Sequence, residues 1–328
     1  MRKVIFFTDP QHVSQALDYF NMQEFSEKQV PVKLHMGEIK NKHFPRPAFV
    51  KTVITELKQR KIQPYLLDTT VAYPGLRHSK TGYKKVARLH GFSVKKIGCP
   101  VVIDDTGITQ HIEQRDYDVA EHLFHASSIF AISHVKGHIA TGMGGAIKNF
   151  GMGGVTKETK KRMHHGCRPV YNKDACTYCG VCAEVCPFNA LQVKHSTWKQ
   201  NLRSCFGCGV CVNLCEHKAL TFQDVDLQYT LACAVKACVH EKNVLYLNDV
   251  NRIAKSCDCD PFADPIICPD IGYLLSDDPV AVDKASLDLI HNVKEDVFLQ
   301  ETNIDPMKQI KYGEEIGLGS ASYQLIEI

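Results

Sequence analysis

The sequence predicts an α/β fold, with a mostly parallel sheet, helices on both of its faces and a small cysteine-rich insertion. Short apolar runs alternate with amphipathic stretches from the N-terminal region onward, as in β–α units with buried parallel strands. This alternation stops at a cysteine-rich block that runs roughly from Cys167 to Phe222, and it resumes afterwards. The expected organisation is therefore one α/β domain in two parts, residues 1–166 and 225–328, with residues 167–224 inserted between them.

Before the insertion, the apolar runs that indicate strands are Lys3–Thr8, Val30–His35, Tyr65–Thr69, Pro100–Ile103 and Ile129–His134. The stretches that indicate helices are Gln11–Phe20, Pro47–Lys61, Tyr83–His90 and Tyr117–Phe124. The pattern is clearest at Pro47–Lys61, where apolar residues recur at the i, i+3, i+4 and i+7 positions of one helix face. After Thr141, six glycines fall within thirteen residues, which predicts a turn with unusual backbone angles.

After the insertion, the sequence predicts a helix at Leu227–Val239 and strands at Val244–Leu247 and Ile266–Ile271. A further helix is expected to begin after Asp278, because this residue is suited to the N-cap and Pro279 to the first helical position. The α/β pattern thus continues on both sides of the cysteine-rich block.

The composition is that of an ordinary globular protein, with 44% hydrophobic and 23% charged residues in a chain of 328. The net charge of +3 is small and scattered, so no nucleic-acid partner is expected. The first apolar run is short and ends at Asp9, and no run reaches the 18 apolar residues of a membrane span. We therefore expect a cytoplasmic protein without a membrane partner, in a compartment that keeps its cysteines reduced.

Eight of the fifteen cysteines form two arms of identical spacing, C-x2-C-x2-C-x3-C. The first arm holds Cys176, Cys179, Cys182 and Cys186, and the second holds Cys205, Cys208, Cys211 and Cys215. The second arm repeats the first after 29 residues, and the match extends to glycine, valine, alanine and leucine positions between and after the cysteines. The sequence therefore indicates an internal duplication.

This spacing is typical of ligands to [4Fe–4S] clusters. Three closely spaced thiolates on a tight turn reach three irons of one cube, while the fourth cysteine of the arm points to the other cube. The sequence therefore predicts two clusters with crossed ligation, and the chain should handle electrons. The first cluster is assigned to Cys176, Cys179, Cys182 and Cys215, and the second to Cys205, Cys208, Cys211 and Cys186.

Over about fifty residues, this block resembles the bacterial two-cluster ferredoxins. One residue departs from that family, because Glu216 stands where a second proline equivalent to Pro187 is usual. Zinc bound by pairs of cysteines is the alternative, and four evenly spaced cysteines in duplicated arms fit it poorly. A purely structural role for the clusters, as staples of a small domain, stays open.

The rest of the chain resembles the family named domain of unknown function 362, whose members often contain a ferredoxin insertion. The stretches that carry this resemblance are Asp68–Tyr73 with Arg77, His134–His138 with Gly144–Asn149, Cys257–Cys259 with Pro269–Gly272, and Asp277–Asp283. They span most of the chain, and the family name implies no activity.

A shorter segment is similar to part of the nickel-pincer lactate racemases. Its pattern is His138-x3-Gly142-x2-Gly145-x2-Lys148, followed by His164. In those enzymes a lysine anchors the pyridinium-derived cofactor, and histidines act as metal ligand and as acid or base. The resemblance implies a pocket in which His138, Lys148 and His164 are the catalytic candidates, without implying racemisation.

The same segment has the features of a binding site in its own right. A strand that ends at His134 leads into the glycine-rich turn, at the strand end where α/β sheets place their ligands. Lys148 would add a positive charge that holds an anion. The alternative is that the glycines only form a tight turn and that His134, His138 and His164 are surface residues.

Outside the two arms, Cys257, Cys259 and Cys268 form the one further group that suggests a metal. The C-x-C spacing is unusual for zinc, and buried thiols are common, so core packing is the alternative. We expect the other cysteines, Cys99, Cys167, Cys233 and Cys238, to be core residues.

The function favoured by the sequence is an oxidoreductase in which two clusters exchange electrons with a reaction site in the α/β domain. Its redox partner would be a ferredoxin or a flavoprotein, and its small-molecule substrate and any further metal or organic cofactor are left unidentified. Two alternatives stay open: an electron-transfer or assembly subunit without its own chemistry, and a non-redox, isomerase-like enzyme with structural clusters. No dinucleotide fingerprint, Walker loop or Ser-His-Asp order is readable in the sequence.

Overall fold

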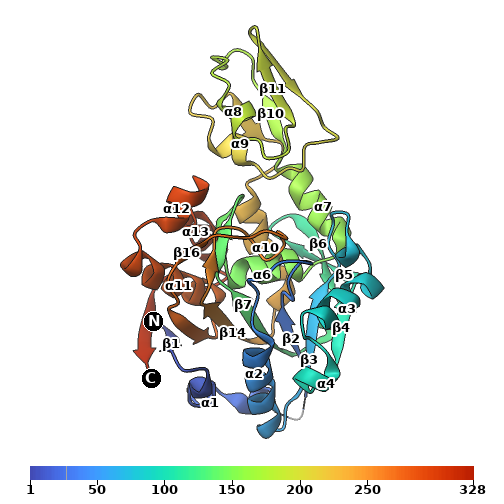
Figure 1. Cartoon of the computed structure of the whole chain (residues 1–328), viewed down its shortest axis with the longest axis vertical. Coiled ribbons are helices and arrows are strands. Elements are labelled where there is room, and N and C mark those ends of the chain that lie inside the picture. Colours follow the sequence, from blue (N-terminus) through green and yellow to red (C-terminus); the bar gives the residue numbers. More distant parts are fainter. Residues whose placement is uncertain (27) are drawn as a thin grey trace.

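The computed structural model describes residues 1–26 and 28–328, and in these residues an eight-stranded sheet forms the centre of the larger lobe (Figure 1). The strand order is β18-β1-β17-β14-β7-β2-β3-β4. The strands are β1 (Arg2–Phe7), β2 (Gln29–Leu34), β3 (Gln63–Thr69), β4 (Val101–Asp104), β7 (Ser128–His134), β14 (Asn243–Val250), β17 (Gly272–Ser276) and β18 (Tyr323–Glu327). Only β17 runs antiparallel to its neighbours in this sheet. The predicted α/β class with a mostly parallel sheet is confirmed.

Helices cover both faces of the sheet. Successive strand residues point to opposite faces, and each face contributes to a separate hydrophobic core. In β7, Ile129 and Ala131 belong to one core, and Phe130 and Ile132 belong to the other. The first core is covered by α6 (Ala146–Gly153), α10 (Leu227–Val239), α11 (Pro279–Val293) and α13 (Met307–Glu315). The second core is covered by α1 (Val13–Leu17), α2 (Pro47–Gln59), α3 (Lys80–Leu89) and α4 (Val94–Ile97).

The remaining elements lie around this frame. The other helices of the larger lobe are α5 (Glu121–His125), α7 (Lys157–Gly166) and α12 (Val297–Thr302), with short 3-10 turns at Pro10–His12, Met22–Glu24 and Leu76–His78. Three two-stranded ribbons pair β5 (Gly107–Ile112) with β6 (Arg115–Ala120), β8 (Lys136–His138) with β9 (Gly142–Gly144), and β15 (Ile253–Ala254) with β16 (Ile266–Cys268). Among the described residues, no helix combines the length and apolar character that crossing a membrane requires.

The cysteine-rich block forms a small lobe of its own, which Figure 1 shows above the sheet and next to α7. Its elements are β10 (Pro169–Tyr171), α8 (Val181–Glu184), β11 (Leu191–Lys194), β12 (Thr197–Gln200), α9 (Val210–Asn213) and β13 (Leu220–Phe222). The chain enters and leaves the lobe side by side, since β10 and β13 pair antiparallel with Pro169 opposite Phe222. Strands from both sides of the block belong to the same central sheet.

Two predicted elements are wrong. Residues Tyr117–Phe124 do not form one helix, because β6 ends at Ala120 and α5 begins only at Glu121. Buried Tyr117 and Val119 alternate there with more exposed aspartates, which is the period of a strand. The predicted strand Ile266–Ile271 stops at Cys268, because Pro269 lacks the N–H that a ladder needs. The strand that enters the sheet at this point is β17.

Candidate functional site

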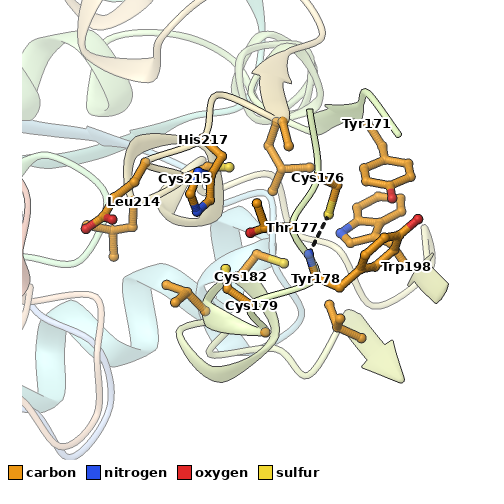
Figure 2. A pocket seen from close by; sticks show the side chains of 16 residues that line it. Tyr171, Cys176, Thr177, Tyr178, Cys179, Cys182, Trp198, Leu214, Cys215 and His217 are labelled. Carbon is orange, nitrogen blue, oxygen red and sulfur yellow. Dashed lines mark hydrogen bonds between the residues drawn. The ribbon is translucent and has the colours of Figure 1, made fainter. Parts of the chain in front are cut away.

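Two cavities in the small lobe are each lined by four cysteines. The first, of about 130 Å³, contains Cys176, Cys179, Cys182 and Cys215, and Figure 2 shows these four side chains around it. The second, of about 20 Å³, contains Cys186, Cys205, Cys208 and Cys211. Each cavity therefore combines three cysteines of one arm with the last cysteine of the other arm.

The backbone around both cavities suits thiolate ligands. Gly180 and Gly209 precede the two short helices with φ angles of +85° and +75°, a conformation that a side chain would disfavour. Backbone N–H groups donate to sulfur at Cys176, from Tyr178 at 3.4 Å, and at Cys186, from Ala190 at 3.2 Å. Such donors stabilise the charge on sulfur and tune the potential of an iron–sulfur cluster. The residues present therefore fit two four-thiolate groups.

A third cavity, of about 450 Å³, lies between the small lobe and the sheet. On the sheet side it is lined from the carboxyl ends of β2, β3 and β7, where α/β proteins place their ligands. On the other side it is lined by Phe188, Phe206 and Cys208 of the small lobe. His138, Lys148 and His164, the three candidates from the sequence, all line this cavity. We call it the basic cavity, because its lining includes Lys33, Arg77, Lys136, Lys148 and Lys160.

Two of these lysines lack a carboxylate partner. Lys33 lies 2.9 Å from Asp68, and Lys136 lies 3.5 Å from Asp258. In the described part of the chain, neither Lys148 nor Lys160 lies within 4.0 Å of a carboxylate. Burial lowers the pKa of Lys160 to about 7, so this amine takes up its proton near neutrality. The cavity therefore favours an anionic ligand.

His164 connects the basic cavity to the second group of cysteines. Its Nδ1 lies 3.2 Å from the carbonyl oxygen of Gly207, and its ring centroid lies 4.2 Å from that of Phe206. Burial lowers the pKa of His164 to about 4, so the ring is neutral at pH 7. A neutral ring that donates from Nδ1 keeps the lone pair of Nε2 available.

Cys257 and Cys259 meet His138 and Lys148 in the same cavity. One ligand atom each of His138, Cys257 and Cys259 lies within 4.8 Å of the other two, and the Lys148 amine donates to the Cys257 sulfur at 3.3 Å. The hydrogen bond from Cys259 holds the pKa of Cys257 well below its ordinary value, and nearby Lys148 lowers it further despite burial. The same shared hydrogen bond raises the pKa of Cys259.

Cys268 is not part of this group, which corrects the set expected from the sequence. It lies in β16 opposite Ile253 of β15, and it does not line the basic cavity. His138 takes its place beside the other two cysteines.

Sequence reasoning missed several residues of the basic cavity, including Lys33, His35, Lys136 and Lys160. Two of them had a readable signal. Lys33 is a charged residue inside an apolar strand, and His35 directly follows the same strand at its carboxyl end. Lys160 had none, since its helix reads as an exposed, charged stretch.

Two solved structures align with this chain at low sequence identity. Among solved structures, the lactate racemase apoprotein from Thermoanaerobacterium thermosaccharolyticum aligns at 10% identity and a TM-score of 0.41, covering 76% of this chain and 51% of that one. A structural-genomics protein from Thermotoga maritima aligns at 12% identity and a TM-score of 0.45, covering 94% of this chain and 59% of that one. The chain thus spans little more than half of either.

No curated protein matches the sequence. A family model does match, over residues 30–288, and therefore includes most of the central sheet, without β1 and β18, together with the small lobe and the basic cavity. The chain belongs to the family described as Domain of unknown function (DUF362).

Proposed function

We propose that the protein is an iron–sulfur oxidoreductase in which two [4Fe–4S] clusters exchange electrons with a small organic anion in the basic cavity. The observation that carries this proposal is that Cys208, one of the four cysteines of the second group, lines the basic cavity as well. A cluster on that group would lie beside the ligand. The residues on the other side of the ligand would be Lys148, His138 and Lys160.

The grouping of the cysteines supports clusters over zinc. Crossed sets of three cysteines plus one are what two cubes require. Among the described residues, neither set offers three sulfurs within 4.8 Å of one another. A zinc tetrahedron with Zn–S bonds of about 2.3 Å would need sulfurs about 3.8 Å apart. The larger distances between the sulfurs suit a [4Fe–4S] cube, because each of its four thiolates binds a different iron.

The arrangement also suggests a direction for the electrons. The first group of cysteines does not line the basic cavity, and Cys179 in it is exposed to solvent. We infer that a ferredoxin or flavoprotein docks near Cys179, and that electrons pass through the first cluster to the second. The clusters supply transfer of one electron at a time.

The residues of the basic cavity would bind and orient the substrate. Lys148 and Lys160 would hold its anionic group, since both lack a carboxylate partner within 4.0 Å among the described residues. His164, neutral at pH 7, would accept a proton at Nε2 when one is released next to the second cluster.

Substitution of Lys160 tests whether the cavity and the second cluster act together. At about pH 6, Lys160 carries its proton, because its pKa is about 7. Lys160→Met then removes a positive charge, which should lower the midpoint potential of the second cluster. At about pH 8.5 the wild-type amine is already neutral, so the difference should vanish. The measurement is an anaerobic redox titration followed by electron paramagnetic resonance (EPR), and Cys186→Ala identifies the signal of the second cluster.

Lys84→Met is the matched control, because Lys84 is an exposed lysine of α3, away from the basic cavity. It should leave both potentials unchanged at both pH values. If Lys160→Met also leaves them unchanged, the cavity is not coupled to the cluster. The chain would then be a carrier or an enzyme with structural clusters.

A further inference from the structure

Three possible metal ligands lie close together in the basic cavity, and none of them is one of the eight arm cysteines. We propose that Cys257, Cys259 and His138 bind a single transition-metal ion, with an open coordination position that faces the basic cavity. All three residues line that cavity, and their ligand atoms lie within 4.8 Å of one another. Two thiolates and an imidazole around one ion at about 2.0 to 2.3 Å need this closeness. This centre does not depend on the clusters.

The loop that carries the two cysteines is fixed from behind by Asp258. The Asp258 carboxylate is fully buried, and its Oδ1 lies 2.7 Å from Nδ1 of His134 at the end of β7. The amine of Lys136 lies 3.5 Å from the other carboxylate oxygen of Asp258. The backbone N–H of Glu38 donates to the backbone carbonyl of Asp258 at 2.9 Å. The flanking cysteines both line the cavity. The loop is thus held in place by strand ends, which pre-organises its thiols.

The hydrogen bonds of His138 leave one ring nitrogen available for a metal. Thr141 donates its hydroxyl hydrogen to the carbonyl of Met143 at 2.9 Å. The same hydroxyl therefore accepts from Nδ1 of His138, which lies 2.9 Å away. The backbone N–H of Ala140 donates to the same Nδ1 at 3.3 Å, so this longer bond and a proton on Nδ1 are alternatives. In the tautomer with the proton on Nδ1, the Nε2 lone pair is available to a metal, as in a metal-bound histidine whose other ring nitrogen donates to a neighbour.

The donor set selects the class of metal and the type of site. Two thiolates and one imidazole favour a soft or borderline ion such as zinc, nickel, cobalt or iron over magnesium or calcium. Three protein ligands with a fourth position open to a cavity are the arrangement of a catalytic centre, whereas structural sites are closed by four. The Lys148 amine, 3.3 Å from the Cys257 sulfur, lies where it can hold an anionic ligand of that ion.

Cobalt(II) is a suitable probe for this site in the complete protein. Oxidised [4Fe–4S] clusters give no EPR signal, so the EPR signal of bound cobalt(II) can be quantified in their presence. Thiol-reduced wild-type protein, prepared anaerobically, should bind one cobalt ion beyond its iron, with the absorption of cobalt–thiolate bonds. Cys257→Ser, Cys259→Ser and His138→Gln should each weaken binding on the order of 100-fold. Asp258→Asn, which only loosens the loop, should weaken it about 10-fold.

Cys268→Ser is the matched control, since Cys268 is a buried cysteine of the neighbouring ribbon outside the group. It should keep full cobalt affinity. Iron content, sulfide content and the melting temperature show whether each variant is folded. If a cysteine variant is not folded, cobalt binding by His138→Gln tests the proposal instead. The proposal is overturned if wild-type protein binds no extra cobalt, or if folded Cys257→Ser and His138→Gln bind it as wild type does. Loss of iron in every protein would instead contradict the clusters.

Discussion

Substitution of Cys215 best distinguishes crossed ligation from ligation in which each arm holds its own cluster. It lies at the end of the second arm, yet it lines the cavity of Cys176, Cys179 and Cys182. Cys215→Ala should therefore damage the first cluster and spare the second, with iron content reduced toward half. The measurement is iron and sulfide analysis with EPR of the reduced protein. Cys186→Ala, its counterpart in the first arm, should spare the first cluster, and loss of the same signal in both variants would refute the assignment.

At the residue scale, the sequence predicts the parts of the site that have a local pattern. The arm cysteines repeat at fixed spacing, and the likeness around Lys148 indicates a pocket. The meeting of His138 with Cys257 joins residues more than 100 positions apart, so no local pattern could reveal it. The expected partner Cys268 is close in sequence to Cys259 but lies in strand β16, opposite Ile253, whereas Cys257 and Cys259 lie in the loop that connects β15 with β16. Sequence distance alone therefore did not predict which cysteines meet.

At the scale of elements, α6 places Lys148 in the cavity, and Asp283 of α11 holds the start of α6. Its carboxylate accepts from the backbone N–H groups of Ala146 at 2.7 Å and Ile147 at 2.9 Å. The side-chain amide of Asn248 donates to the same carboxylate at 2.8 Å. Asp283→Ala should lower the free energy of unfolding by about 2 to 5 kcal/mol, because three buried donors lose their acceptor. Denaturant unfolding followed by circular dichroism measures this.

Asp277→Ala is the control for that substitution, because Asp277 is exposed in the same stretch. It should change the free energy of unfolding by no more than about 0.5 kcal/mol. Equal effects of the two substitutions would mean that the Asp283 contacts do not stabilise α6.

Elements with strong local signals were predictable, and elements defined by tertiary contacts were not. Helix α10 has the predicted bounds, and α11 begins as predicted, with Asp278 accepting from the Val280 and Ala281 N–H groups at 2.8 and 2.9 Å. β6 was misread because Tyr117 and Val119 also fit an apolar helix face when only a few residues are considered. The antiparallel direction of β17 depends on its neighbours in the sheet and leaves no mark in its own residues.

At the scale of the whole molecule, the small lobe is attached to the α/β lobe by two adjacent segments. Pro169 pairs with Phe222, and the N–H of Asp224 donates to the carbonyl of Gly166 at 2.8 Å. Cα atoms of antiparallel neighbours are about 5 Å apart, so a linker of about three residues can replace residues 169–222. The product should be a soluble, cooperatively melting protein without iron, as judged by circular dichroism and calorimetry. An unfolded or aggregated product would show that the α/β lobe depends on the insertion.

Metal and sulfide analysis of anaerobically purified protein tests the central claim most directly. Two [4Fe–4S] clusters on the crossed cysteine groups predict about eight irons and eight acid-labile sulfides per chain. On reduction, EPR should show the magnetic interaction of two nearby paramagnetic clusters. Stoichiometric zinc without labile sulfide, or iron for a single cluster, would contradict the account.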